Sequence, residues 1–444
     1  MKIAYLTAGA AGMYCGSCLH DNTLAAALLE RGEDVTLTPI YTPIRTDETD
    51  VSDRRVFYGG INVYLQQLSG LFRGTPRWLD RLLDHPALLR LASRGGGSVD
   101  PSKLGGLTVS MLRGEDGNQR KEVDRLVDWI VGADRPDVIH LSNSMMIGVA
   151  RQIARRGGPP VVCSLSGEDI FLEKLTAPHY DQARDLLRDR AADIDAFVAL
   201  NGYYADFMAD YLAVDRSKIE VIPHGLLLNG HATEPNRPEG ATRRIGYLAR
   251  VCHDKGLHLL AEAGELLAAR DDLPPFEIEA AGYLGAGDRA YLAEIERKAA
   301  AGPLAGRFRY LGELDRRQKI EFLQSLHLMA LPTVYRESKG LPVLESLANG
   351  TPVVVPEHGS FPEIISDTGG GVLFEPHNAA ELAERLAGLL KDDSQAAELG
   401  ERGRSKVHKH YHADRMAERT LQLYQRIAAD RLQADGLRGD RVRV

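Results

Sequence analysis

Short apolar runs alternate with helical patterns along almost the whole chain, and this alternation constrains the fold more than any other feature of the sequence. The first run, KIAYLT at 2–7, leads through a glycine-rich loop to the helical pattern 23–32, and the run 34–40 follows. This order of strand, helix and strand is typical of a parallel, doubly wound sheet with helices on both faces. Later strand-like runs lie at 137–142, 160–166, 196–201 and 218–223.

The alternation is interrupted once and then starts again, which indicates two α/β domains in a chain of 444 residues. The interrupting segment, 224–242, is polar and rich in proline and glycine, as linkers are. Ligands of such domains are expected in a central cleft faced by the carboxyl ends of both sheets. The strand-like runs of the second set lie at 243–249, 276–282, 308–312, 327–333, 351–357 and 371–374.

These patterns predict how the chain is divided. The tail after 412 has a helical apolar pattern, and chain ends are often disordered. The predicted segments, in chain order, are an N-terminal domain over 1–225 with an insertion at about 50–120, a linker over 226–242, a second domain over 243–412, a helix over 413–432 and a disordered tail over 433–444.

Composition excludes several classes of protein. A formal net charge of −8 argues against broad binding of nucleic acid. The sequence has no apolar run of the length that a membrane span needs, and its first residues already have a strand pattern instead of a secretory signal. Four cysteines are too few for a disulfide framework, which favours a reducing cytoplasm.

The segment ESKGLPVLE at 337–345 places two glutamates, Glu337 and Glu345, on either side of a Gly-Leu-Pro turn. Gly340 gives the backbone freedom to turn, and Pro342 suits the first position of a helix. Exposed amides at a helix start attract anions such as phosphate, and carboxylates accept hydrogen bonds from hydroxyls. The pattern therefore predicts a site for a phosphate with hydroxyl-bearing groups on both sides, as a nucleotide sugar has.

Two other segments favour an anionic ligand. RVCHDKG, directly after the first strand of the second domain, contains Arg250 and Lys255. These suit a diphosphate, because arginine binds in a fork and lysine as a point charge, although solvated loop charges are the alternative. The loop 8–18 contains glycines, among them Gly16, that allow a ligand to approach the backbone closely.

Together these segments resemble family 4 of the GT-B glycosyltransferases. The E-x7-E segment, the R-x4-K-G segment, the glycine loop before a long helix, HGSFPE at 358–363 and the closing helix all occur in the family's order. The resemblance spans nearly the whole chain and is strongest over 243–390. It implies an α/β fold of two Rossmann-like doubly wound domains that face a central cleft, with a C-terminal helix that crosses back to the N-terminal domain.

The resemblance implies a role for each matching charged residue. Glu337 would bind hydroxyls of the donor sugar, and Glu345 would bind the hydroxyls of its ribose. Arg250 and Lys255 would hold the diphosphate. Glu337, Arg250 and Lys255 are therefore the candidates for catalysis.

Other residues match the family's donor site through the backbone. The turn at Gly340, Leu341 and Pro342 falls where the family wraps the phosphate, although Pro342 has no N–H to donate. Of the family's glycine pair before the first helix, this chain retains Gly16. Lys339 stands where an aromatic residue is frequent, and it either adds positive charge near the phosphates or lies at the surface.

The acceptor side departs from the family's pattern. Many relatives have a histidine where this chain has Ser166, in the stretch SLSGED. Glu168 or Asp169 is a candidate for a polar role there, and the alternative is that both cap the next helix. His140, at the end of a predicted strand, is a further acceptor-side candidate, with a packed structural histidine as the alternative.

The amphipathic stretch 71–94, inside the predicted insertion, has several basic residues. It favours an acceptor-site lid, with plain packing or contact with a membrane surface as alternatives.

Two segments could indicate a metal site or a redox function: Cys15-Gly16-Ser17-Cys18 and HKHYH at 408–412. The first has no second C-x-x-C to complete a site and is better explained by small residues that line a ligand loop. The second is better explained as a solvated helix end, so we expect no metal.

The resemblance implies a cytoplasmic enzyme that transfers a hexosyl group, with retention and without a metal ion, from a nucleotide diphosphate sugar to an acceptor hydroxyl. UDP-glucose or GDP-mannose is the expected donor, without another cofactor, and a carbohydrate, lipid or small molecule is the expected acceptor. No nucleic acid partner is expected, and the enzyme would be a monomer or a homodimer. Two alternatives stay open: another GT-B nucleotide-sugar enzyme, such as an epimerase or a phosphorylase, and a non-catalytic nucleotide-sugar-binding protein.

Overall fold

The computed structural model of the chain describes residues 1–9, 16–53, 104–232, 234 and 242–441. Contacts divide it into two compact units. The N-terminal unit combines Met1–Pro223 with the C-terminal segment that begins at Ala413, and the second unit is His224–His412. Part of the predicted linker, from 226 to 232, therefore belongs to the second unit, where Leu226 pairs with His412.

The N-terminal unit is built on a six-stranded sheet in which all paired strands are parallel. The strands lie in the order β2-β1-β3-β4-β5-β6, so the direction of winding reverses between β1 and β3. Each of them falls within a run that the sequence predicts as a strand. Their bounds are β1 (Lys2–Thr7), β2 (Asp34–Pro39), β3 (Val138–Leu141), β4 (Val161–Leu165), β5 (Ala196–Ala199) and β6 (Ile219–Val221).

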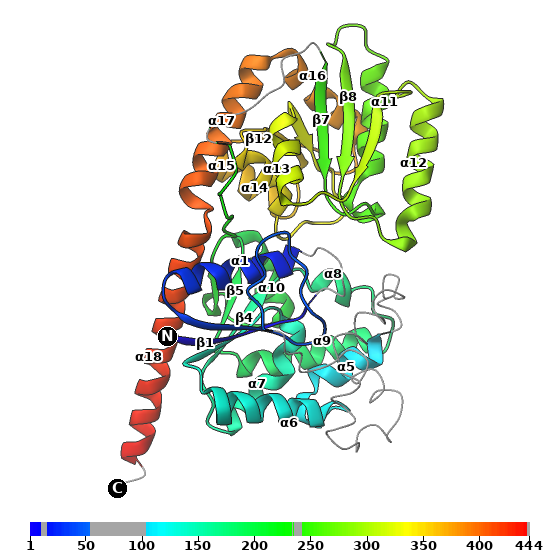
Figure 1. Ribbon diagram of the computed structural model, residues 1–444. Coiled ribbons are helices and arrows are strands. Elements are labelled where there is room, and N and C mark those ends of the chain that lie inside the picture. The colour runs from blue at the N-terminus through cyan, green and yellow to red at the C-terminus, as the bar shows by residue number, and fades with distance from the viewer. Residues whose placement is uncertain (10–15, 54–103, 233, 235–241, 442–444) are drawn as a thin grey trace. The chain divides into compact units, whose positions relative to one another are not determined.

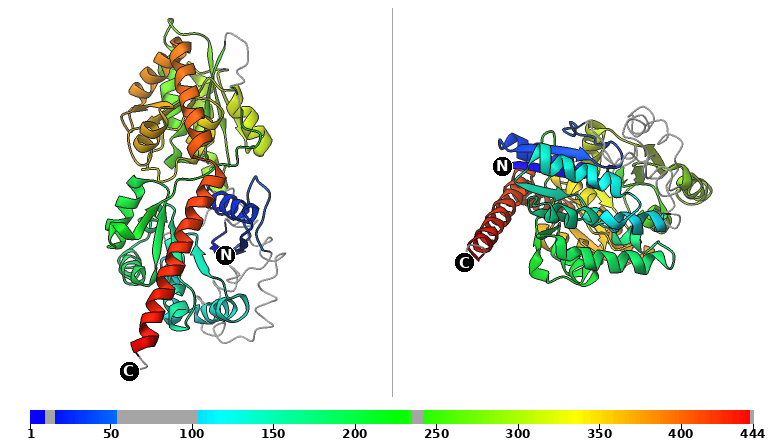
Figure 2. Two further views of the ribbon diagram at one scale, coloured as in Figure 1. Left: turned by 90° about the vertical axis from the view of Figure 1, so that its left-hand side faces the viewer. Right: turned by 90° about the horizontal axis from the view of Figure 1, so that it is seen from below.

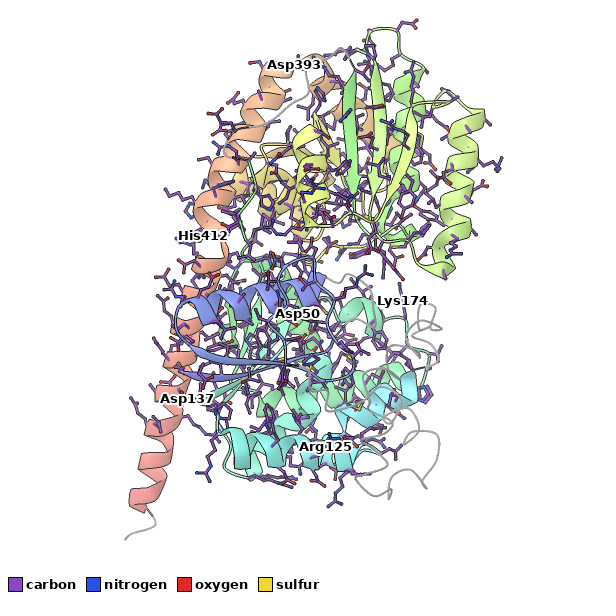
Figure 3. The ribbon with its side chains drawn as sticks, viewed as in Figure 1. Asp50, Arg125, Asp137, Lys174, Asp393 and His412 are labelled. Carbon is purple, nitrogen blue, oxygen red and sulfur yellow. The ribbon has the colours of Figure 1, made fainter. Side chains whose placement is uncertain are left out.

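Helices cover both faces of this sheet, and side chains fill the space between them (Figures 1 and 3). One face presents buried residues such as Leu6, Leu141 and Leu165 to the core that includes α5, α6, α7 and α9. The helices of the unit are α1 (Gly16–Glu30), α5 (Gly105–Leu112), α6 (Arg120–Asp128), α7 (Ala150–Arg155), α8 (Asp169–Leu172), α9 (His179–Arg190), α10 (Gly202–Leu212) and α18 (Ala413–Arg441). The unit also has the 3-10 helices η3 (Gly114–Asp116), η5 (Ser144–Val149), η6 (Ala191–Asp193) and η7 (Arg216–Lys218), and the π-helix η4 (Trp129–Asp134).

The second unit repeats the architecture with a parallel six-stranded sheet in the order β12-β11-β10-β7-β8-β9. Its strands are β7 (Arg243–Leu248), β8 (Phe276–Ala281), β9 (Phe308–Gly312), β10 (Leu328–Ala330), β11 (Val353–Pro356) and β12 (Gly371–Phe374). Its helices are α11 (Leu257–Ala268), α12 (Arg289–Ala301), α13 (Arg316–Ser325), α14 (Leu341–Ala348), α15 (Phe361–Thr368), α16 (Ala379–Lys391) and α17 (Asp393–His410), with the turns η8 (His253–Lys255) and η9 (Ala286–Asp288). The predicted parallel α/β fold is confirmed in both units.

The C-terminal helix α18 packs against α1 within the N-terminal unit (Figure 2). It continues to Arg441 and so enters the segment 433–444, which the sequence predicts as disordered. This part of the chain contains three arginines and no proline that would stop the helix, although Gly436 and Gly439 are weak helix formers. Among the described residues, no helix is both long and apolar enough to cross a membrane.

The predicted insertion at 50–120 is partly an ordinary portion of the N-terminal unit. Its end forms α5, whose Val109 and Leu112 are buried in the core. The amphipathic stretch 71–94 lies outside the described residues.

Candidate active site

The candidate site of the second unit is a group of charged and polar side chains that lies where β7 and β10 are neighbours in the sheet. β7 is the first strand of this unit, β8 pairs with it on one side and β10 on the other, so the winding reverses between β7 and β10. The chain that follows each strand leaves from the same edge of a parallel sheet. The segments containing Lys255 and Glu337, far apart in sequence, therefore meet at the kind of position where open α/β sheets bind ligands.

Lys255 is brought to this edge by a tight turn after β7. It ends η8, and Gly256 follows in the left-handed region with φ of 75°. A Cβ atom on Gly256 would lie 1.7 Å from the carbonyl oxygen of Pro332, in the segment after β10. The Lys-Gly pair of the motif thus has a packing reason: only glycine lets the β7 turn lie against the β10 segment.

Glu337 is buried and accepts hydrogen bonds from side chains and from the backbone. Its Oε2 atom accepts from Lys255 Nζ at 2.6 Å and from the Tyr335 hydroxyl at 2.8 Å. Its Oε1 atom accepts from the amide of Lys339 at 3.3 Å. Only 5% of the residue is exposed, so this carboxylate is held by neighbours instead of by water.

The ionisation of Glu337 follows from these contacts. Burial alone would raise the pKa of this carboxyl group. The charge of Lys255 opposes that effect, together with hydrogen bonds from Lys255, Tyr335 and the Lys339 amide, and the pKa is lowered to about 2. Glu337 is therefore an ionised acceptor at neutral pH.

The loop before α15 contacts the backbone of Glu337. The amide of Ser360 donates to the Glu337 carbonyl oxygen at 2.7 Å. Gly359 has φ of 63°, and a Cβ atom there would lie 2.5 Å from the same carbonyl oxygen. The HGSFPE segment thus fixes the backbone at Glu337.

The turn after Glu337 leads into α14 as the sequence predicts. Gly340 precedes the helix with φ of 69°, a conformation that favours glycine. The helix begins at Leu341, so Pro342 is its second residue and not its first. Pro342 has no N–H, and the amide of Val343 donates to the Gly340 carbonyl oxygen at 3.0 Å. The helix dipole still attracts an anion to the amides of this turn.

Glu345, the second glutamate of the pair, lies inside α14 and is 5% exposed. Its Oε1 atom accepts from Lys319 Nζ, on α13, at 2.5 Å.

Arg250, the other predicted diphosphate ligand, follows β7 and is exposed. Its carbonyl oxygen accepts a hydrogen bond from the Tyr247 hydroxyl. Within the described residues, the structure thus brings Lys255, Glu337, Lys339 and the start of α14 together, and places Glu345 farther along the same helix.

The acceptor-side candidates after β4 form a different arrangement in the N-terminal unit. Glu168 is buried and accepts from the amides of Ser144 and Ser166, each at 2.7 Å. The Tyr204 hydroxyl donates to Asp169 at 2.7 Å. Glu168 occupies the N-cap position of α8 but makes no side-chain cap hydrogen bond there, so the capping alternative is wrong for Glu168. Its carboxylate instead joins the loops after β3 and β4.

His140 is fully buried, and both of its ring nitrogens have partners. Nε2 lies 2.7 Å from Ser164 Oγ, Nδ1 bonds the Tyr424 hydroxyl of α18, and the ring stacks on Tyr5 at 4.4 Å between centroids. Burial, and then the nearby His20, lower the pKa of His140 to about 3. This is the environment of a packed structural histidine, so the acceptor-side role considered for His140 lacks support.

The glycine loop after β1 is described only at its ends. Gly16 begins α1, and residues 10–15 lie outside the described residues. Gly9 has φ of 81°, and a Cβ atom there would lie 1.8 Å from the carbonyl oxygen of Thr42. Gly9 is therefore needed for close packing of the loop against the backbone of Thr42, and not for the approach of a ligand.

Sequence reasoning missed two residues that contact the predicted glutamates. Tyr335 bonds Glu337 from two positions earlier, and Lys319 bonds Glu345 from another helix. Neither belongs to a motif, and only the spatial order of α13 and α14 could have indicated Lys319. Within the described ranges, no group of three or more histidine, cysteine or acidic side chains is arranged to hold a metal ion.

Comparisons with known proteins agree with this architecture. A model described as glycosyl transferase 4-like domain matches residues 22–225, and one described as glycosyl transferases group 1 matches 233–406. The chain is 26% identical over 359 residues to a phosphatidyl-myo-inositol mannosyltransferase of Mycolicibacterium smegmatis, and the match covers 79% of this chain and 86% of that protein.

Solved structures share the fold. Sucrose-phosphate synthase from Thermosynechococcus elongatus superposes with a TM-score of 0.71 at 17% identity, over 97% of this chain and 100% of that one. Anabaena HepE in complex with UDP superposes with a TM-score of 0.64 at 16% identity, over 96% and 100%. Two parallel sheets of this order, with these likenesses, define the GT-B class, and the prediction of two Rossmann-like domains is confirmed. The chain belongs to family 4 of these enzymes and is a glycosyltransferase.

Proposed function

We propose that this glycosyltransferase moves a hexosyl group from a nucleotide diphosphate sugar to an acceptor hydroxyl, with retention and without a metal ion. The observation that supports this most is the ionised, buried Glu337 beside Lys255 and the start of α14. A carboxylate, an ammonium group and a helix start together match the hydroxyls and the phosphates of such a donor.

Each part of the donor has a partner in this proposal. Lys255, Arg250 and the amides at the start of α14 bind the diphosphate, and Lys339 adds positive charge beside it. Glu337 accepts hydrogen bonds from sugar hydroxyls. Glu345 accepts from the ribose hydroxyls, for which Lys319 must share its carboxylate.

The chemistry follows from the charge that develops. The bond between the anomeric carbon and the phosphate oxygen breaks, and negative charge builds on the leaving diphosphate. Lys255, Arg250 and the α14 amides stabilise this charge. The acceptor hydroxyl attacks the anomeric carbon from the face that the diphosphate leaves, and its proton passes to the leaving phosphate oxygen.

UDP-glucose and GDP-mannose are the donors that we would test first. The HepE structure contains UDP, and the similar mycobacterial protein is named a mannosyltransferase. A carbohydrate, a lipid headgroup or a small molecule would be the acceptor. The cytoplasm is the proposed location, and the three described cysteines, Cys18, Cys163 and Cys252, are buried and form no disulfide with one another.

A donor screen tests the proposal. UDP-, GDP- and ADP-sugars are screened by thermal shift, and those that stabilise the protein are assayed for transfer to candidate acceptors with and without EDTA. We expect one donor to raise the melting temperature, transfer that EDTA does not abolish, and a product whose anomeric configuration by NMR equals that of the donor. Stabilisation by none of these sugars at millimolar concentration would refute the donor site. Binding without transfer would favour a sensor, and an altered free nucleotide sugar would favour an epimerase.

A further inference from the structure

Tyr335 forms a closed set of contacts with the two charged residues of the candidate site. Its hydroxyl donates to Glu337 Oε2 at 2.8 Å, and Lys255 Nζ donates both to that hydroxyl oxygen and to Glu337 Oε2. The ammonium group also lies 4.8 Å from the centroid of the tyrosine ring. Each of these three side chains therefore contacts the other two.

The directions of these hydrogen bonds are determined by the chemistry of the groups. An ammonium group only donates and a carboxylate only accepts, so the hydroxyl accepts from Lys255 and gives its single proton to Glu337. Burial, and then the charge of Glu337, raise the pKa of Tyr335, which keeps that proton in place. Glu337 Oε2 thus has two side-chain donors, whereas the donor to Oε1 among the described residues is the amide of Lys339, at 3.3 Å.

Donor binding must change this arrangement. In the proposed function Lys255 binds the diphosphate, whose charge competes with Glu337 for the same ammonium group. Glu337 is almost wholly buried, and a buried carboxylate that loses all its donors is costly. The Tyr335 hydroxyl is a neutral donor, so the phosphates attract it less strongly than they attract Lys255.

We propose that Tyr335 is a positioning residue that holds Glu337 Oε2 when Lys255 turns to the donor diphosphate, so that Oε1 remains aimed at a sugar hydroxyl. This inference rests on the proposed function. In this proposal the ion pair between Lys255 and Glu337 exists only when no donor is bound. The hydrogen bond between Tyr335 and Glu337 exists both with and without the donor. Tyr335 acts through Glu337 and needs no contact with the donor.

The test separates binding of the nucleotide from binding of the sugar. Tyr335→Phe and wild type are titrated with UDP and UDP-glucose, or with GDP and GDP-mannose, whichever pair binds wild type, and transfer is then assayed. We expect affinity for the free diphosphate to change by less than about twofold, and kcat/KM for the nucleotide sugar to fall by about tenfold. The ratio of the two affinities is the critical readout, because general damage to the site would weaken both ligands alike.

Tyr411→Phe is the matched control, because Tyr411 also donates to a carboxylate, that of Asp367 at 2.6 Å, within the same unit. It should leave both affinities unchanged. Equal behaviour of Tyr335→Phe and Tyr411→Phe, or an equal loss for the diphosphate and the sugar nucleotide, would overturn the assignment to Tyr335 alone. Failure of wild type to bind any of these nucleotide sugars would overturn the proposed function, and this inference with it.

Discussion

Both units place a buried glutamate at the carboxyl edge of a parallel sheet, but the two carboxylates have different partners. Glu337, in the second unit, is held mainly by the side chains of Lys255 and Tyr335. Glu168, in the N-terminal unit, is held by the backbone amides of Ser144 and Ser166. A side chain can turn to a ligand at the cost of a rotamer change, whereas an amide moves only with its loop.

This difference supports the proposal that Glu337 belongs to a ligand site and Glu168 to the scaffold of its unit. The partners of Glu337 include the ammonium group of Lys255, whose side chain can rotate, and they lie beside the start of α14. A bound anion can therefore take over the contact of Lys255 with Glu337. The partners of Glu168 tie two loops together, and their loss would leave two buried amides without an acceptor. Mutations at the two glutamates should therefore change different properties.

The largest effect is expected for Glu337→Gln. The variant keeps the shape of the side chain but loses the charge that pairs with Lys255 and the acceptor strength that a sugar hydroxyl needs. We expect kcat/KM to fall roughly 1,000-fold, about 4 kcal/mol. The melting temperature should change little, because Lys255 is partly exposed and can reach water. Activity within a few-fold of wild type would remove Glu337 from the donor site.

The reverse pattern is expected for Glu168→Ala. Two buried amides lose their acceptor, so the free energy of unfolding should fall by about 3 kcal/mol in chemical denaturation. Affinity for a nucleoside diphosphate should stay as in wild type. Glu168→Gln, which keeps one acceptor oxygen, should lose less stability and serves as the control. An unchanged unfolding free energy in Glu168→Ala would show that Glu168 is not a structural tie.

Much of this comparison could be predicted from the sequence, because its causes are local. Apolar runs predict all the described strands, and the glycine in the 337–345 segment predicts the turn before α14. The motifs that contain Lys255 and Glu337 predict that both residues bind one nucleotide diphosphate sugar. Their meeting then follows from the order of strands, since β7 and β10 are neighbours.

The remainder depends on contacts between distant segments. No pattern near Tyr335 distinguishes it from a surface tyrosine, and its role appears only when Lys255 arrives from another loop. Alternation along β3 places His140 on one face of the sheet, but the helix that covers this face comes from the far end of the chain. Glu168 resembles a helix cap in sequence because one of the amides that it binds, that of Ser144, belongs to the loop after a different strand.

The buried histidine of the N-terminal unit should make stability depend on pH. Burial lowers the pKa of His140 to about 3, below its ordinary 6.5, so the unfolded chain binds a proton here that the folded chain does not. Stability from this residue is therefore complete above about pH 6.5 and falls as the pH drops toward 3, by about 1.4 kcal/mol per pH unit. Between pH 6.5 and 5 the loss is about 2 kcal/mol.

His140→Gln isolates this effect, because glutamine does not titrate. The variant is less stable at neutral pH, but its unfolding free energy should fall less steeply between pH 6.5 and 5. His231, whose pKa burial and nearby positive charges lower to about 4, contributes equally to both proteins and cancels in the difference. Glu337 cancels too, because its pKa is depressed and its contribution is lost only below its ordinary value of 4.5. Parallel curves would mean that His140 binds its proton equally well in the folded and unfolded chains, so that its pKa is not lowered by folding.

The smallest effect is expected for Tyr424→Phe, which removes the hydroxyl that ties α18 to the sheet. The ring of Tyr424 stays buried in the variant, and His140 keeps its bond to Ser164, so the loss among the described contacts is the bond between Tyr424 and His140. We expect a loss of about 1 kcal/mol in unfolding free energy. Donor affinity and kcat should remain those of wild type, because this hydroxyl contacts a histidine with no exposed surface. A fall in kcat at unchanged stability would place His140 and Tyr424 in the function of the N-terminal unit, and it would break the contrast between a scaffold there and a ligand site in the second unit.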